Sequence, residues 1–237
     1  MRQDEFGLVF LGAIVLCFNS GYVNSLTFNT VYEIASTHVT GVITLSSIAL
    51  YKKHYTIFFY FVMNYLLFLV GSITSGVFIY YDHFHLGRRY GKMLILIGLI
   101  QILGLVLETH YPQSIYFVWC CSLTSGMQNA LTSKYSKNLV RSTHMTGCTT
   151  DFGLIMGHAL IGKDEEIWKL PLLGCSILGF FFGGLLGTFV YDCYTHFALL
   201  FSIITTISAG IVHMVFIYGV SNRDANGGEQ IHRVVEI

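Results

Sequence analysis

The chain has 237 residues, of which 54% are hydrophobic and 11% charged, and its mean hydropathy is +0.62. A soluble domain carries about 25% charged residues, so this composition excludes an ordinary soluble protein and favours an integral membrane protein. The formal net charge is zero, with 13 Lys and Arg against 13 Asp and Glu, and nothing in this balance indicates a nucleic-acid partner.

Eight apolar segments follow one another along the chain, and each is predicted to be a helix of an all-α membrane protein. They cover residues 6–28, 38–51, 55–80, 93–109, 113–132, 142–161, 170–191 and 195–219. Six of them approach the length of about 20 residues that a helix needs to span a bilayer. The segment 38–51 is shorter and the segment 142–161 carries polar side chains, so we expect these two to be broken or re-entrant.

The basic residues favour this six-crossing arrangement. If all eight segments cross, the 13 Lys and Arg residues divide almost equally between the two sides of the membrane, whereas with six crossings only Lys52 and Lys53 lie opposite the rest. Because cytoplasmic loops are rich in Lys and Arg, we predict a multi-pass protein of the plasma (inner) membrane with both termini in the cytoplasm. A fully spanning segment 142–161 remains the alternative, and residues 220–237 are expected to form a flexible cytoplasmic tail.

Two polar motifs occur twice, in the same order. SGYVNSLT at 20–27 matches SGMQNALT at 125–132, and the hexapeptide STHVTG at 36–41 matches STHMTG at 142–147. Two such matches predict an internal duplication of about 105 residues, with repeat one over 6–109 and repeat two over 113–219. Three crossings per repeat would invert the second repeat, as in many transporters and channels, whose sites lie at the repeat interface near the midplane.

At these motifs the sequence resembles the YoaK-like family of bacterial membrane proteins, a domain family of unknown function. That family carries stretches similar to GYVDALTF, HMTGN, GMQNAL and VRTTYVTGTLTDLG, where this chain has GYVNSLTF, HVTGV, GMQNAL and VRSTHMTGCTTDFG. The chain departs from the family pattern at Asn24, Val42 and His144. The resemblance covers nearly the whole chain and implies a multi-helix membrane fold, without naming a substrate.

The repeated polar residues are the candidate substrate-binding site. Ser and Thr are favoured at helix N-caps, so helices beginning at 36–37 and 142–143 would direct free N–H groups into the membrane, where they can bind an anion or polar solute. The alternative is that these residues only cap broken helices and join helices together. The candidate residues are Asn24, Thr37, His38, Thr40, Gly41, Gln128, Asn129, Thr143, His144, Thr146, Gly147 and Asp151.

Asp151 differs from the other candidates because the first repeat has Leu45 in its place. An acid at this depth is a candidate proton or cation site. The alternatives are an ion pair with Arg141, a hydrogen bond to Thr149, or a position near the cytoplasmic face.

Small residues mark the third spanning segment of each repeat. Gly179, Gly183 and Gly187 recur every fourth residue, and Gly71 and Gly76 form a similar face. Such faces allow helices to approach closely, so we expect these segments to pack at the centre of the fold or at a homodimer interface.

The leading hypothesis is a membrane transporter or channel for a small polar solute or ion. The second is a non-transporting scaffold or accessory protein, in which the polar pairs only hold the fold. The third, an intramembrane enzyme, lacks any HExxH, GxSxG or paired-acid motif in its support. The expected partners are the lipid bilayer, the solute and a second copy of the chain; no cofactor, metal or nucleic acid is expected.

Overall fold

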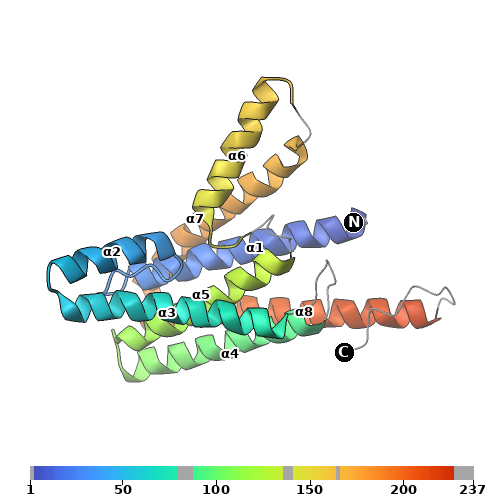
Figure 1. The fold of residues 1–237 in the computed structure, drawn as a ribbon. Helices are drawn as coiled ribbons and strands as arrows, with labels where there is room; N and C mark the ends of the chain where they lie inside the picture. The colour runs from blue at the N-terminus through green and yellow to red at the C-terminus, as the bar shows by residue number, and fades with distance from the viewer. Residues whose placement is uncertain (1–2, 80–87, 136–140, 164–165, 227–237) are drawn as a thin grey trace.

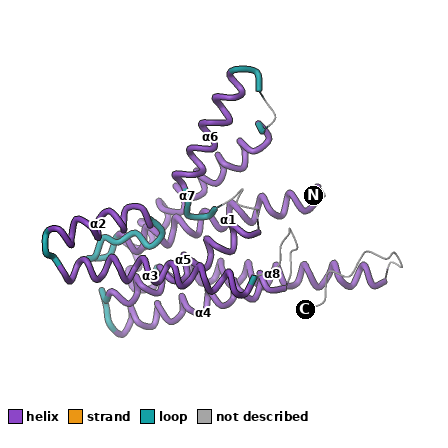
Figure 2. Tube along the Cα trace, in the orientation of Figure 1, coloured by secondary structure: helices purple, strands orange, loops and turns teal. Residues whose placement is uncertain are grey.

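The computed structural model describes residues 3–79, 88–135, 141–163 and 166–226, and within these ranges the chain is helical, with no strand (Figures 1 and 2). The helices are α1 (Gln3–Phe28), α2 (Val39–Tyr51), α3 (Tyr55–Phe78), α4 (Arg88–His110), α5 (Ile115–Tyr135), α6 (Met145–Leu160), η1 (Ile167–Lys169), α7 (Leu170–Tyr194), η2 (Thr195–Phe197) and α8 (Leu199–Asn226). The prediction of an all-α protein with eight helices is therefore confirmed.

The predicted segments match these helices closely, because each apolar run is bounded by polar residues that end it. The two segments expected to be short correspond to α2 with 13 residues and α6 with 16. The helix α8 continues to Asn226, so the first residues of the segment predicted as a flexible tail are helical. Residues 227–237 of that tail lie outside the described part of the chain.

Five of the described helices are long and apolar enough to span a bilayer: α1, α3, α4, α7 and α8. The chain is therefore built as a multi-pass membrane protein. The helix α5 has 21 residues, but it is too polar to belong to this set. Its polar side chains face the helices α1, α3 and α4 that pack around it, and polar groups in a membrane helix face protein rather than lipid.

The helices α1 and α7 pack together in the same direction. Gly179 lies against Ile14, Gly183 lies against the carbonyl of Phe18, and Gly187 lies against Tyr22. A Cβ atom on Gly183 would overlap the Phe18 carbonyl oxygen, so only glycine permits this approach. The glycine face therefore packs against another helix of the same chain, but α7 does not lie at the centre of the fold as expected, because only 22% of its span is buried.

The helices α3 and α5 repeat this arrangement. A Cβ atom on Gly71 would overlap the carbonyl oxygen of Leu123, and one on Gly126 would overlap that of Phe68. The Ser75 hydroxyl donates a hydrogen bond of 2.7 Å to the carbonyl of Met127. Residues later in α3 contact residues later in α5, so these two helices also run in parallel.

The helices α4 and α8 pack in opposite directions. Gly91 lies against Gly210 in a mutual close approach, whereas Gly104, further along α4, lies near Leu199 at the start of α8. In Figure 1, α1 and α2 run toward the same end of the bundle and α3 returns from it. The short helix α2 therefore continues the direction of α1 and forms a hairpin with α3.

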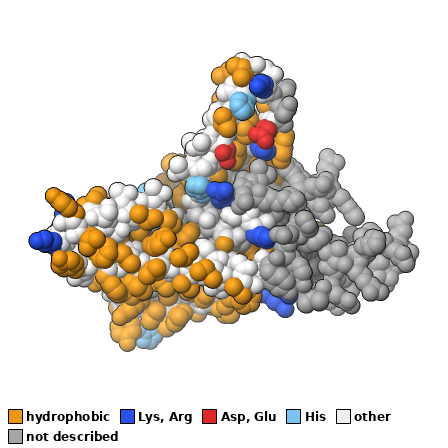
Figure 3. All heavy atoms as spheres, in the orientation of Figure 1, with side chains coloured by type: hydrophobic (Ala, Val, Ile, Leu, Met, Phe, Trp, Pro, Cys, Tyr) orange, Lys and Arg blue, Asp and Glu red, His pale blue; other side chains and the backbone are white. Residues whose placement is uncertain are grey.

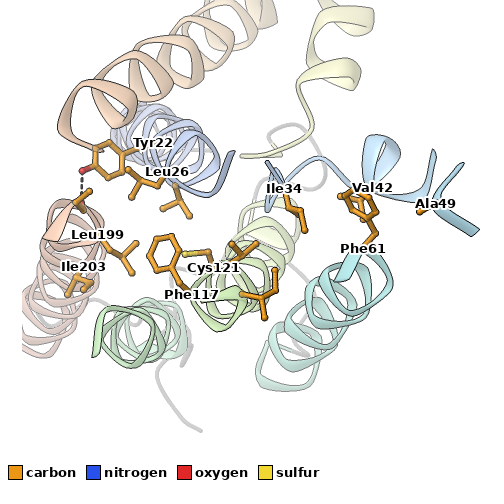
Figure 4. Packing of buried hydrophobic residues seen from close by; sticks show 14 residues of the cluster. Tyr22, Leu26, Ile34, Val42, Ala49, Phe61, Phe117, Cys121, Leu199 and Ile203 are labelled. Atoms are coloured by element: carbon orange, nitrogen blue, oxygen red, sulfur yellow. Dashed lines mark hydrogen bonds between the residues drawn. The ribbon is translucent and has the colours of Figure 1, made fainter. Parts of the chain in front are cut away.

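The main core joins both halves of the chain (Figure 4). Leu26 of α1 and Leu199 of α8 are fully buried in it with Cys121 of α5. The Tyr22 hydroxyl donates a hydrogen bond to the carbonyl of Ala198. Because lipid is as apolar as these side chains, their close packing rather than escape from water contributes the stability in a membrane.

The helix α6 and the first turns of α7 lean away from the other helices in Figure 1. Their contact is a small cluster in which Cys148 and Ile155 of α6 are buried against Leu173 of α7. Figure 3 shows Asp, Glu, His, Lys and Arg side chains on this projection, whereas the visible faces of α2, α3 and α4 are largely hydrophobic.

Candidate functional site

The two repeated motifs of the first half bind each other. The connection after α1 leaves the backbone N–H groups of residues 36 and 37 outside any helix, and α1 supplies their acceptors. The Ser36 N–H donates to the Thr27 hydroxyl at 3.0 Å, and the Thr37 N–H donates to Asn24 Oδ1 at 3.1 Å. The Thr37 hydroxyl also donates to Asn24 Oδ1, at 2.7 Å. Side chains of α1 thus satisfy backbone groups that lipid could not.

The second half makes the equivalent contacts with longer distances. The Ser142 N–H donates to the Thr132 hydroxyl and the Thr143 N–H donates to Asn129 Oδ1, both at 3.3 Å. In each half, the Asn and Thr side chains at the end of the first helix accept hydrogen bonds from the backbone N–H groups of the Ser and Thr that open the hexapeptide. This pairing gives a structural reason for the presence of both motifs in each half.

The helix starts differ from the expectation. The N-cap residues are His38 for α2 and His144 for α6, and neither makes a side-chain capping hydrogen bond. The prediction of Ser or Thr caps is wrong, because those residues lie one and two positions before the N-cap. Each imidazole instead lies over the first turn of its helix, where it occupies the space beside Gly41 or Gly147.

The remaining candidates near the helix starts lie on the surface. Thr40 and Thr146 are exposed, like the two histidines. Asp151 is exposed on α6, and among the described residues it has no ion pair with Arg141. The Arg141 guanidinium instead lies 2.9 Å from Nδ1 of His144.

One face of α5 carries a polar row that links the two hexapeptides. Ser125, Gln128 and Thr132 are all buried, and their spacing of three and then four residues places them on one face of the helix. Ser36 of the first hexapeptide lies 3.3 Å from Ser125 between the hydroxyl oxygens, and Ser142 of the second lies 3.4 Å from Thr132. We call Ser125, Gln128 and Thr132 the polar row.

The centre of the polar row is an amide cluster shared by three helices. Asn19 lies in the middle of the span Phe10–Phe28, and its Nδ2 donates to Gln128 Oε1 at 3.1 Å and to the Thr206 hydroxyl at 3.2 Å. The Gln128 amide donates to Ser20 Oγ and to the carbonyl of Leu16, each at 2.8 Å. Both halves of the chain thus contribute to one buried polar cluster.

A fourth helix adds Gln101 to this region. Its Nε2 donates to the Ser202 hydroxyl at 3.0 Å, and Gln101 is 2% exposed. Ser202 lies one turn from Thr206 on α8, so the two contacts are neighbours. The Oε1 atom of Gln101 has no hydrogen-bond partner among the described residues.

The polar row brings together only part of the predicted site. Gln128 lies at its centre, while Asn24 and Asn129 hold the two hexapeptides beside it. The hexapeptides do not touch in the described residues: they meet α5 at residues 125 and 132, about 10 Å apart along the helix axis. His38 and His144, which belong to different hexapeptides, are therefore not brought together into one site.

Two residues of the buried cluster, Asn19 and Gln101, are not among the candidates that the sequence indicates. Both are amides in the middle of apolar runs, and this position is the signal that could identify them. Neither residue belongs to a repeated motif, so the duplication does not point to them. The buried acid Glu108 was also missed; its Oε1 accepts the N–H of Gln113 at 3.1 Å, so it stabilises the turn after α4.

Other possible sites in the described residues are separate from the polar row. An open pocket is bordered by Val77, Phe78, Arg89 and Lys92, where α3 ends and α4 begins. The described residues hold no group of three or more His, Cys, Asp or Glu side chains that is placed to bind a metal.

Comparison with known proteins gives one finding. A family model described as a protein of unknown function, DUF1275, matches residues 12–212, which is most of the chain. Neither the curated proteins nor the solved structures include a match. The family match is consistent with the resemblance to the YoaK-like family. The chain belongs to the DUF1275 family.

Proposed function

We propose that the protein is a membrane transporter or channel for a small polar solute, with its substrate site at the buried cluster around Gln128. The observation that carries this proposal is the polar row on α5 together with Asn19 and Thr206, which come from different halves of the chain. Polar side chains within a membrane are costly and typically mark solute pathways.

We further propose that the chain consists of two repeats with inverted topology. Support comes from the glycine contacts: Gly21 meets Phe180 as Gly126 meets Phe68, and Gly183 meets Phe18 as Gly71 meets Leu123. The backbone at His38, with φ −92° and ψ 65°, also matches His144, with φ −95° and ψ 63°. The opposite directions of α4 and α8 are those that an inverted pair requires.

The proposed topology has six crossings, with α5 as the sixth and with α2 and α6 as short broken or re-entrant helices. In its support, the turn that carries Lys52 and Lys53 lies at one end of the bundle in Figure 1, and Arg89, Lys92 and Lys134 belong to the helix ends at the other. By the positive-inside rule, that second end would face the cytoplasm, and the bilayer would be the plasma membrane.

The pathway would run along the polar row. A solute that enters on the side of the first hexapeptide would first meet Ser36 and Ser125. It would then meet the amides of Asn19 and Gln128, and finally Ser142 of the second hexapeptide. Each step offers hydroxyl or amide groups that can exchange hydrogen bonds with a passing solute. In the present arrangement these groups bond one another, which corresponds to a closed pathway.

Substrate-dependent thermal stabilisation of the purified protein tests this proposal. The probes are a panel of small uncharged solutes, inorganic anions and alkali cations. We expect at least one probe to raise the melting temperature, and Gln128→Leu or Thr206→Val to remove this shift. Thr206→Val preserves side-chain shape, so it keeps the test valid if Gln128→Leu fails to fold.

Thr74→Val on α3 is the matched control, since the Thr74 hydroxyl bonds the carbonyl of Val70 in its own helix. It should retain the shift. Stabilisation that survives Gln128→Leu and Thr206→Val would place the site elsewhere, and the absence of any stabilising probe would count against transport.

The alternative is a scaffold in which these polar groups only join helices. The observation in its favour is that Gln128 uses both its amide oxygen and its amide nitrogen within the chain. Such cross-helix bonds contribute about 0.6 kcal/mol each. Under this alternative, Gln128→Leu would remove three such bonds and lower stability by about 2 kcal/mol, and no probe would bind.

A further inference from the structure

The buried cluster contains an acceptor that has no partner in the described part of the chain. Gln101 is 2% exposed, yet its Oε1 has no hydrogen-bond partner among the described residues. An unsatisfied buried polar group costs about 1–3 kcal/mol. The chain tolerates this cost at a position where Leu or Ile occupies most of the neighbouring sequence, in LILIGLIQILGLVL.

The surroundings of this acceptor are polar but uncharged. Ser202 accepts the Gln101 amide hydrogen, and Thr205 and Thr206 on the same face of α8 bond Asn19. All of these side chains, with Gln128, are neutral amides or hydroxyls. Along α4 the nearest ionisable side chain is Glu108, seven residues from Gln101, which is about 10 Å along the helix.

This chemistry discriminates against ions. A charged solute taken out of water requires an opposite charge or a dense shell of dipoles, and without them the desolvation cost is several kcal/mol. A neutral solute with O–H or N–H groups loses far less, and it can donate to Gln101 Oε1 while it exchanges bonds with the hydroxyls of α8.

We propose that Gln101, with Ser202 and Thr206, forms the subsite that selects an uncharged solute carrying hydrogen-bond donors, such as a polyol or a urea-like amide. This inference rests on the proposed transport function and specifies its substrate class. The Gln101 amide would hold the solute through Oε1 while its nitrogen remains bonded to Ser202.

The experiment measures solute flux into proteoliposomes made from the full chain. The uncharged probes are urea and glycerol, followed by light scattering after osmotic shock, and the ionic probes are potassium and chloride, followed by ion-sensitive dyes. We expect urea or glycerol flux above that of protein-free vesicles, with no ion flux.

Gln101→Leu should lower the uncharged-solute flux at least tenfold. The change removes the unsatisfied Oε1 and also the bond to Ser202, so the melting temperature should change little. A Gln101 that only joins α4 to α8 would give the same small change in melting temperature without a loss of urea or glycerol flux. Thr74→Val should retain full flux.

The outcomes separate the two proposals. Ion flux without urea or glycerol flux would overturn the uncharged-solute class and leave transport supported. Uncharged-solute flux that Gln101→Leu does not reduce would overturn the subsite. Water permeation alone would overturn the inference as well, and the absence of flux for all probes would count against the transport function itself.

Discussion

The first and second hexapeptides begin two short helices in the same way, but those helices then lie in different surroundings. The helix α2 packs along α3, where Val42 and Ala49 join the main core. The helix α6 leans away with α7 and buries Cys148 and Ile155 in a small cluster of its own. The hexapeptides therefore determine the helix start, and not where the helix lies.

The residues that follow each hexapeptide account for the difference. The exposed side chains of α2 include Ile43, Leu45 and Ile48, which suit contact with lipid tails. On α6, Leu154 and Met156 are exposed as well, but so are Asp151 and His158, and a charge is costly in the hydrocarbon core. The two short helices thus have related starts and different outer faces.

Substitutions at positions 45 and 151, which the repeat aligns with each other, should have the largest effect on stability. Leu45→Asp should destabilise the membrane-inserted state by about 3 kcal/mol, the cost of an acid within a membrane helix. Asp151→Leu should change it by less than about 0.5 kcal/mol, as expected for an exposed position. The measurement is the thermal unfolding of each variant in lipid nanodiscs. A stabilisation by Asp151→Leu as large as the loss caused by Leu45→Asp would show that α2 and α6 occupy the same environment.

Adding a methyl group at the crossing glycines should rank next. Gly21→Ala and Gly126→Ala should each lower the free energy of unfolding by about 2 kcal/mol, because the new Cβ overlaps a backbone carbonyl and overpacking costs about 1–3 kcal/mol. Unfolding in detergent measures both. Gly76→Ala is the control, since nothing lies within 4 Å of its Cβ position; a similar loss there would refute the crossing geometry.

The asparagines that hold the hexapeptides should show a smaller and unequal effect. Asn24→Ala removes two hydrogen bonds of 3.1 and 2.7 Å, whereas Asn129→Ala removes one of 3.3 Å. We expect losses of about 1.5 and about 1 kcal/mol in the free energy of unfolding, since leaving a buried N–H unsatisfied costs about 1–3 kcal/mol.

Chemical denaturation followed by tryptophan fluorescence measures this difference, and Ser46→Ala serves as the control. The Ser46 hydroxyl is bonded to the carbonyl of Ile43 in its own helix. A greater loss for Asn129→Ala than for Asn24→Ala would mean that the first connection is not the tighter of the two.

Hydrogen exchange should detect the smallest difference. Backbone amides of α6 should exchange faster than those of α2, because local opening is easiest where few apolar contacts are made. Mass spectrometry of peptides covering residues 39–51 and 145–160 measures both rates in one sample. Slower exchange in α6 would indicate that it docks as firmly as α2.

Much of the fold is determined by the sequence alone. The length of each apolar run indicated the long helices, and the short run at 38–51 indicated α2. The duplicated motifs identified Asn24, Asn129 and Gln128 as polar residues with a role in the membrane. These inferences hold because run length and residue type act locally, within one helix or one connection.

Only the tertiary structure decided which polar residues meet. Asn19 and Thr206 are 187 residues apart, and Gln101 and Ser202 are 101 apart. The proposed site is centred on Gln128 rather than on the histidines, because α1 packs against α5 and places Asn19 and Ser20 beside Gln128. A hydrogen bond between helices depends on how their faces are rotated and how closely they approach, and no short stretch of sequence contains that information.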